Sequence, residues 1–120
     1  MIEGIGIDIT ETGRIAKMLK QQPRFVERVL TEREQQEFFE LPERRKVEWL
    51  SGRFAAKEAF SKATGTGIGK DLSFQDIEIF CDERGKPFVQ RPFFEGVHLS
   101  ISHSDSYAVA HVVIERKRME

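Results

Sequence analysis

The residues best suited to chemistry lie together at positions 52–63, which hold a carboxylate and several cations. Glu58 and Lys62 are four positions apart, so on a helix they lie only about 40° apart around the axis. Arg53 and Lys57 add two positive charges to the same segment. One interpretation of Glu58 and Lys62 is a surface ion pair that contributes only about 0.2–0.5 kcal/mol. The other, which the surrounding residues favour, is a site for a metal-bound phosphate.

A second carboxylate, Asp8, stands near the end of a strand pattern at residues 1–10. Isoleucines occupy one face of this strand, and Gly4 and Gly6 occupy the other. Two glycines on one strand face indicate close approach by another backbone or a ligand. A slim, alanine-rich helix packed there would bring Glu58 beside Asp8. Two adjacent carboxylates repel and need a cation between them, and oxygen ligands favour Mg²⁺, with Mn²⁺ as the alternative.

The glycine-rich run 65–69 is similar to a nucleotide-binding loop but stands in the wrong context. A phosphate-binding loop follows a strand and opens a helix, whereas this run closes one. Two interpretations stay open. The run is a glycine helix cap followed by a flexible loop, or its backbone N–H groups lie against a phosphate.

The histidines and the single cysteine give weaker indications. His103 lies in a polar turn and is either a solvated loop residue or a phosphate contact. His111 lies in an apolar strand and is expected in the core. The three histidines lack metal-ligand spacing, and the contiguous Ser104, His103 and Asp105 cannot form a hydrolase triad. Cys81 is expected to be a small buried or half-buried residue.

The element pattern predicts an α+β fold with an antiparallel sheet. Residues 1–10 form the first strand, and helices are expected at 11–22, 23–30, 31–40 and 42–64. Thr31 and Glu34 match a capping box, and Gly65 is the expected left-handed stop of the longest helix. A hairpin turning at 81–87 follows, then strands at 97–102 and 107–114, the last expected to be buried on both faces. The charged tail 115–120 is expected to fray.

The composition indicates one domain spanning residues 1–120. The net charge of −1 gives no bias toward nucleic acid, although residues 14–28 carry five cations against one carboxylate. A chain this short buries a limited fraction of its surface, so an oligomer is an alternative to a monomer. No leader peptide or membrane-spanning apolar run is visible, which predicts a cytoplasmic protein without a membrane partner.

Three blocks resemble the sequence motifs of holo-acyl-carrier-protein synthases, the small bacterial class of phosphopantetheinyl transferases. The blocks are GIGIDI at 4–9, FAAKEAFSKA at 54–63 and SISHS at 100–104. The resemblance covers essentially the whole chain and implies the phosphopantetheinyl transferase fold. It also implies a Mg²⁺-dependent enzyme of fatty acid biosynthesis that transfers the phosphopantetheine arm of coenzyme A to a serine of apo-acyl carrier protein, releasing adenosine 3′,5′-bisphosphate.

The resemblance further implies roles for individual residues. Asp8 and Glu58 would bind the metal and, with Lys62, carry the catalysis. The resemblance does not identify the base that takes the serine proton, and the candidates are Glu58 and a water held by the metal. The residues around the coenzyme would be Arg53, Lys57, Lys62, Gly65, Gly85, Lys86, Pro87 and His103.

Two partners are implied as well. The family is usually a homotrimer with each site at a subunit boundary, so that the turn 85–87 faces the adenine of a neighbouring subunit's coenzyme. Acyl carrier proteins are acidic, and the basic residues Arg14, Arg24 and Arg28 form the natural docking surface.

Two other function classes compete with this interpretation. A non-catalytic adaptor could bind acidic helical carrier proteins through residues 14–28 without pairing Asp8 with Glu58. A metal-dependent phosphohydrolase could release phosphate or ADP from small substrates without a protein acceptor. Both alternatives leave the three co-occurring blocks unexplained.

Overall fold

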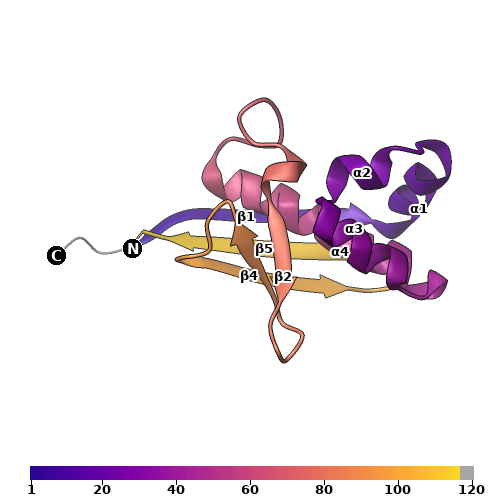
Figure 1. Ribbon diagram of the computed structural model, residues 1–120. Coiled ribbons are helices and arrows are strands. Elements are labelled where there is room, and N and C mark those ends of the chain that lie inside the picture. The colour runs from indigo at the N-terminus through magenta and orange to yellow at the C-terminus, as the bar shows by residue number, and fades with distance from the viewer. Residues whose placement is uncertain (117–120) are drawn as a thin grey trace.

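The computed structural model describes residues 1–116, and Figure 1 shows how their helices and strands are arranged. One long helix, α4, lies across a three-stranded sheet, and three short helices pack at one end of it. The elements in chain order are β1 (Ile2–Glu11), α1 (Thr12–Gln21), α2 (Phe25–Val29), α3 (Glu32–Glu40), α4 (Glu43–Thr64), a 3₁₀ turn η1 (Phe74–Asp76), β2 (Glu78–Cys81), β3 (Pro87–Arg91), β4 (Val97–His103) and β5 (Tyr107–Glu115). The α+β prediction is confirmed.

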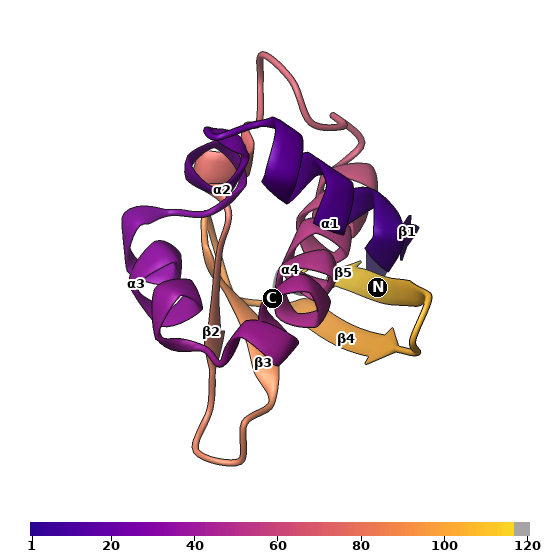
Figure 2. The same cartoon turned by 90° about the vertical axis from the view of Figure 1, so that its right-hand side faces the viewer.

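The sheet has the strand order β1-β5-β4, and both pairings are antiparallel. The strands β2 and β3 form a separate antiparallel hairpin that lies beside β4. In Figure 2 this hairpin lies on the side of α4 away from β1. The long helix therefore separates the first strand from the hairpin.

Close backbone packing joins α4 to β1, as the glycine pattern predicts. A Cβ added at Gly4 would overlap the carbonyl oxygen of Ala63, and one added at Gly6 would overlap that of Ala59. Small residues on both elements thus let the helix and strand backbones touch. The alanines of α4 then share one core with Phe60 of the same helix, Ile77 before β2, and Ile79, Val89 and Val112 of the strands.

The predicted ends of two helices are confirmed. Thr31 caps α3 with a capping box, because its side chain accepts from the Glu34 N–H and the Glu34 carboxylate accepts from the Thr31 N–H. Gly65 ends α4 in the left-handed conformation with φ of 86°. The helix α1 begins after Glu11, whose side chain makes no capping bond, and the Thr12 hydroxyl donates to the Asp105 carbonyl.

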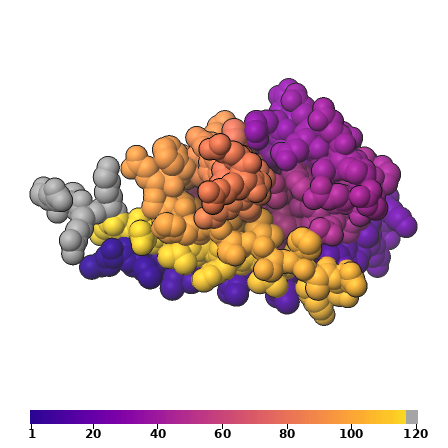
Figure 3. Space-filling view, turned by 90° about the horizontal axis from the view of Figure 1, so that it is seen from below, coloured from indigo at the N-terminus to yellow at the C-terminus, as the bar shows by residue number. Residues whose placement is uncertain are grey.

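The outer face of the sheet is uncovered, which corrects two predictions. Only alternate residues of β5 are buried, so this strand is not buried on both faces. His111 points to the uncovered side and is exposed, because residues at odd positions of β5 face away from α4. The same face carries Ile5, Ile7 and Ile9, which are 59 to 64 % exposed. Figure 3 shows atoms of β1, β4 and β5 together on this side of the molecule.

Candidate active site

The packing of α4 on β1 brings the two predicted carboxylates to one edge of the sheet. Asp8 Oδ1 accepts a hydrogen bond from Lys62 Nζ at 3.2 Å, and its Oδ2 accepts one from the Thr10 hydroxyl at 2.8 Å. Lys62 Nζ also donates to the Ile7 carbonyl at 3.0 Å. Glu58 stands one turn before Lys62 on α4. We call Asp8, Glu58 and Lys62 the acidic half-site.

The electrostatics of Glu58 reflect this proximity. Burial raises the pKa of Glu58, and the neighbouring Asp8 carboxylate raises it further. The charges of Lys62 and Arg14 oppose both effects. Ionising Glu58 beside the Asp8 carboxylate is therefore unfavourable. A bound cation would stabilise both negative charges, so the pair fits a divalent metal.

The donor set also indicates which metal would fit. Across residues 1–116, three or more His, Cys, Asp or Glu side chains are nowhere grouped as metal ligands. Two carboxylates would therefore leave the remaining coordination positions to water and phosphate oxygens. Mg²⁺ is usually bound in this way, through one or two carboxylates together with substrate phosphates.

A pocket of about 320 Å³ lies on the other side of α4. It holds four of the residues predicted to surround the coenzyme, from three different elements, and we call it the basic half-site. These four residues are Arg53, Gly85, Pro87 and His103. Lys86 lies between two of them in the exposed turn that joins β2 to β3.

Arg53 is held firmly in the wall of this pocket. The residue is only 7 % exposed, and Cζ of its guanidinium lies 4.5 Å from the centre of the Trp49 ring. Its Nη2 donates to Cys81 Sγ at 3.4 Å, while Nε has no hydrogen-bond partner in the described structure. Cys81 is exposed, so the expectation of a buried or half-buried cysteine is wrong. The reason is that β2 ends at Cys81, at the mouth of the hairpin.

His103 ends β4 and faces the same pocket. Its Nε2 lies 3.1 Å from the Glu48 carboxylate of α4, and both side chains are nearly half exposed. Four further residues of α4 line the pocket with Arg53, and their helical spacing is a signal that the sequence already carries. They are Arg45, Glu48, Trp49 and Gly52, and this i, i+3, i+4, i+7 pattern marks one helix face.

The two half-sites lie on opposite flanks of α4. Arg53 and Glu58 are five residues apart, which turns them about 140° from each other around the helix. Asp8 is on β1 and His103 is on β4, the two outer strands, which β5 separates by about 10 Å. One copy of the chain thus presents the carboxylates and the basic pocket in different directions.

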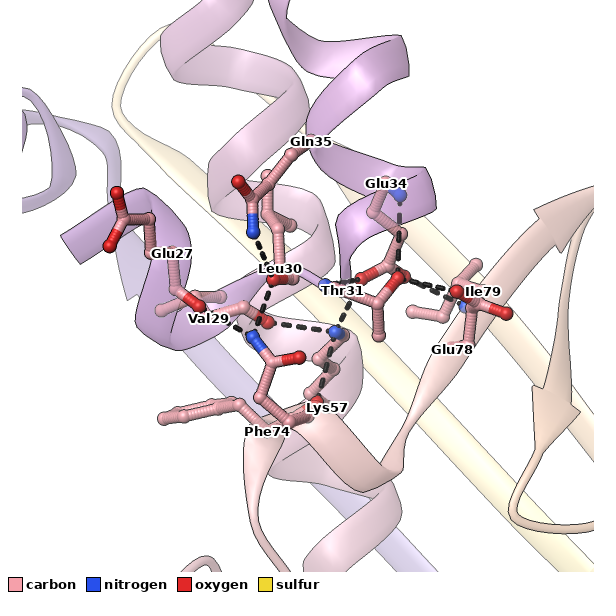
Figure 4. Close-up of polar contacts among 11 residues, drawn as sticks. Glu27, Val29, Leu30, Thr31, Glu34, Gln35, Lys57, Phe74, Glu78 and Ile79 are labelled. Atoms are coloured by element: carbon pink, nitrogen blue, oxygen red, sulfur yellow. Dashed lines mark hydrogen bonds and ion pairs between the residues drawn. The ribbon is translucent and has the colours of Figure 1, made fainter. Parts of the chain in front are cut away.

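Lys57 belongs to neither half-site, and its predicted coenzyme contact is corrected. Its ammonium is fully buried and uses all three donors: on Glu34 Oε1 at 2.6 Å, on the Val29 carbonyl at 2.8 Å and on the Phe74 carbonyl at 3.1 Å (Figure 4). An ammonium has three donors only, so none is left for a phosphate. Burial lowers the pKa of Lys57, and the Glu34 carboxylate opposes that effect.

Glu34 makes Lys57 part of a larger buried network. The other carboxylate oxygen of Glu34 accepts from the Ile79 N–H at 2.8 Å, while the Thr31 hydroxyl donates to Glu78. The network joins α3, α4 and β2, as Figure 4 shows. Lys57 therefore ties together the elements that carry the basic half-site.

The remaining predicted residues are at the surface. Arg14, Arg24 and Arg28 are all exposed, and Arg14 is close enough to Glu58 to influence its pKa. Gly65 is exposed and follows Lys62 by three residues. No helix among the described residues has the length and apolar character needed to cross a membrane.

Comparison with known proteins identifies the family. A model of the 4′-phosphopantetheinyl transferase superfamily matches residues 4–112, so the chain belongs to this superfamily. The holo-[acyl-carrier-protein] synthases of Anoxybacillus flavithermus and Bacillus subtilis are 57 % and 59 % identical to it, and each alignment covers 97 % of this chain and 98 % of the relative. The predicted family is confirmed.

A solved structure confirms the predicted fold. It is a crystal structure of a holo-(acyl-carrier-protein) synthase from Bacillus anthracis in complex with CoA (3′,5′-ADP). It matches this chain with a TM-score of 0.91 and 56 % identity, over 98 % of this chain and 99 % of that one.

Proposed function

We propose that this chain is a holo-acyl-carrier-protein synthase. It transfers the 4′-phosphopantetheine arm of coenzyme A to a serine hydroxyl of apo-acyl carrier protein and releases adenosine 3′,5′-bisphosphate. The observation that carries this proposal is the meeting of Asp8, Glu58 and Lys62 at one sheet edge, in a chain more than half identical to holo-acyl-carrier-protein synthases.

The reaction exchanges the phosphoanhydride bond of the coenzyme's pyrophosphate for a phosphoester bond to serine. The serine oxygen of the carrier protein attacks the phosphorus attached to the pantetheine arm, and the bond from that phosphorus to the bisphosphate breaks. The nucleophile comes from the partner protein, so the enzyme needs positioning and charge stabilisation more than a nucleophile of its own. A Mg²⁺ ion held by Asp8 and Glu58 would supply charge neutralisation on the pyrophosphate.

Lys62 and Glu58 supply the remaining chemistry of the acidic half-site. The Lys62 side chain is about half exposed, which leaves its ammonium free to move from Asp8 to a phosphate oxygen. There it stabilises the charge that develops on the leaving bisphosphate. Either Glu58 or a water held by the metal would accept the proton of the serine hydroxyl.

The basic half-site is assigned to the nucleotide end of the coenzyme. Arg53 is nearly buried and has no ion-pair partner within residues 1–116, so an anion in the pocket would satisfy it. His103 adds a second donor, and Gly85, Lys86 and Pro87 border the pocket from the hairpin turn. Gly65 lies close to Lys62, on the acidic side.

A homotrimer would complete each site. The two half-sites of one chain face apart, so a coenzyme that touches both must lie between two copies. The uncovered sheet face offers the contact, because Ile5, Ile7 and Ile9 expose an apolar strip beside the half-buried Val109 and Val113. Exposed apolar strips of this kind mark association surfaces.

The carrier protein is assigned to the exposed arginines of α1 and α2. Arg14 lies beside the acidic half-site, and Arg24 and Arg28 continue the positive charge along the neighbouring segment. An acidic partner would meet this surface with complementary charge, which chiefly increases the rate of encounter. We place the reaction in the cytoplasm.

A mass-shift assay tests the function. Apo-acyl carrier protein, coenzyme A, Mg²⁺ and this protein are incubated together, and the carrier is expected to gain the phosphopantetheine mass. Reactions without Mg²⁺ or without coenzyme A are expected to show no gain. An unmodified carrier in the complete reaction would refute the transferase. Carrier binding that does not depend on Mg²⁺ or coenzyme A would favour the adaptor instead.

A further inference from the structure

Cys81 places a thiol directly in the wall of the basic half-site. It is the single cysteine of the chain, it is exposed, and it lines the pocket together with Arg53. Arg53 Nη2 donates to its sulfur at 3.4 Å, and the stacking of that guanidinium on Trp49 holds the cation in place. A sulfur that opens to the pocket therefore rests against a fixed positive charge.

Arg53 independently indicates that the pocket takes an anion. The residue is more than nine-tenths buried, yet Nε has no hydrogen-bond partner and the guanidinium has no carboxylate partner among residues 1–116. Buried charges are nearly always paired, so a buried cation without a carboxylate partner in a pocket wall points to an anionic ligand. An anion drawn to Arg53 would come to lie beside the Cys81 thiol.

We propose that Cys81 is a reversible modification site for anionic small-molecule disulfides, and that its modification excludes the coenzyme. This inference rests on the proposed function, which puts the nucleotide end of the coenzyme in the same pocket. The Cys81 sulfur attacks one sulfur of the disulfide. A new S–S bond forms while the old one breaks, and the released thiolate takes up the proton that Cys81 loses. Cys81 is oxidised, and half of the small disulfide is reduced.

The size of the pocket explains why the two ligands exclude each other. At about 320 Å³ it lies at the small end of the range for small-molecule sites, so it holds one bulky group at a time. Thiols of a reducing cytosol would reverse the modification by the same exchange. The site would thus lower transferase activity while disulfides accumulate and restore it afterwards.

The test uses oxidised glutathione as the probe and adenosine 3′,5′-bisphosphate as the competitor, because the bisphosphate has no thiol of its own. Intact-mass spectrometry follows the single glutathione adduct over time. At a bisphosphate concentration about 100-fold above its Kd, only about 1 % of pockets stay free, so modification is expected to slow about 100-fold. The adduct is expected to lose transferase activity and to regain it with dithiothreitol.

Two variants separate this site from any exposed cysteine. Cys81→Ser is expected to form no adduct and to keep the same activity before and after oxidised glutathione, each measured against its own untreated sample. Cys81→Ser with Gln36→Cys carries its thiol on the exposed face of α3, outside the pocket. It is expected to be modified without bisphosphate protection and without loss of its own activity.

Three results would overturn the inference: no adduct at Cys81, an unchanged modification rate in saturating bisphosphate, or full activity in the adduct. The protection measurement requires no turnover, so it is independent of the transferase assay. An active untreated protein whose Cys81 is unprotected would refute this inference alone. An untreated protein that cannot modify the carrier would refute the proposed function.

Discussion

Asp8 and Glu58 carry the same charge in different surroundings, and we expect both to be essential for metal-dependent turnover. Asp8 is hydrogen-bonded to Lys62 and Thr10, whereas Glu58 is half buried and has a raised pKa. Asp8→Asn and Glu58→Gln keep the side-chain size but remove one charged ligand. Losing about 3 kcal/mol of charge stabilisation lowers turnover by at least about a hundredfold. The carrier mass-shift assay, run at several Mg²⁺ concentrations, measures this effect.

A neutralised carboxylate elsewhere provides the control. Asp71 is exposed in the loop after α4, so Asp71→Asn is expected to keep full turnover. Circular dichroism establishes that each variant is folded. Wild-type turnover in both Asp8→Asn and Glu58→Gln would contradict the metal assignment.

The buried pair of Lys57 and Glu34 predicts a stability effect that depends on which partner is removed. Lys57→Met leaves the Glu34 carboxylate buried without its cation, which costs about 3–5 kcal/mol of unfolding free energy. Adding Glu34→Gln removes the orphaned charge, so the double variant is expected to be more stable than Lys57→Met alone. Urea denaturation of the single and double variants measures both values. Strictly additive losses would contradict direct coupling of the pair.

The closeness of Asp8 and Glu58 could be predicted from the sequence, whereas the burial of Lys57 could not. Glycines on one strand and alanines on one helix predict close backbone contact, and that contact is local enough to infer. The burial of Lys57 depends instead on Glu34, the Val29 carbonyl and the Phe74 carbonyl, which come from distant segments. A lysine beside a glutamate that is predicted to be catalytic gives no sign in one sequence that tertiary contacts have already used its three donors.

Among the elements, the contact of β1 with α4 sets the geometry of the acidic half-site. A methyl group at Gly6 would overlap the Ala59 carbonyl oxygen, so Gly6→Ala is expected to push the strand away from the helix. We expect a loss of about 1–3 kcal/mol in unfolding free energy. We also expect weaker Mg²⁺ binding, so that half-maximal turnover requires a higher Mg²⁺ concentration. Urea denaturation and Mg²⁺ titration of turnover measure the two effects.

Gly13→Ala is the matched control for this substitution. Nothing lies within 4 Å of a Cβ at Gly13, which is in the first turn of α1. Alanine favours helix more than glycine by about 1 kcal/mol, so this variant is expected to be as stable as the wild type or more so. Equal destabilisation by the two changes would contradict the steric explanation for Gly6.

The helices α1 and α2 predict a salt-sensitive encounter with the carrier protein. Arg14→Glu reverses a charge at the edge of the acidic half-site and is expected to raise the KM for the carrier about tenfold or more. The KM for coenzyme A should change much less. Added salt should raise the wild-type KM for the carrier, because exposed charges are screened within about 8–10 Å. A KM for the carrier that is unchanged by both Arg14→Glu and added salt would contradict docking at this surface.

Most elements were predictable because their signals are local, such as the capping box at Thr31 and the left-handed Gly65. The sidedness of β5 was not. Its run of apolar residues is typical of a strand covered on both faces, yet residues 1–116 of one chain cover only the face toward α4. Residues such as Val109 and His111 are at the surface of one copy, and a single sequence does not distinguish burial within a chain from burial between chains.

For the whole molecule, the separated half-sites predict that two defective variants rescue each other. Asp8→Asn damages only the acidic half-site, and Arg53→Gln damages only the basic one. In trimers mixed at random from equal amounts, about a quarter of the sites combine two intact halves. Mixing the inactive variants under dissociating conditions and reassembling them is expected to restore about a quarter of wild-type turnover.

Two controls make this result interpretable. Mixing Asp8→Asn with Glu58→Gln is expected to restore nothing, because both changes damage the same half-site. Analytical ultracentrifugation of each sample measures the oligomeric state. Absence of rescue from properly assembled Asp8→Asn and Arg53→Gln mixtures would contradict sites shared between copies.

The strand order has a consequence for how the protein is made. Among residues 1–116 the central strand β5 is the last element, and it is the only sheet partner of both β1 and β4. During synthesis the first strand must therefore wait until residues 107–115 leave the ribosome before any sheet can close around Asp8. A nascent chain short of β5 carries an unpaired β1 with its isoleucines exposed, the kind of segment that chaperones bind. The acidic half-site is encoded largely in residues 8–62, but its supporting sheet closes only after residues 107–115 have been synthesised.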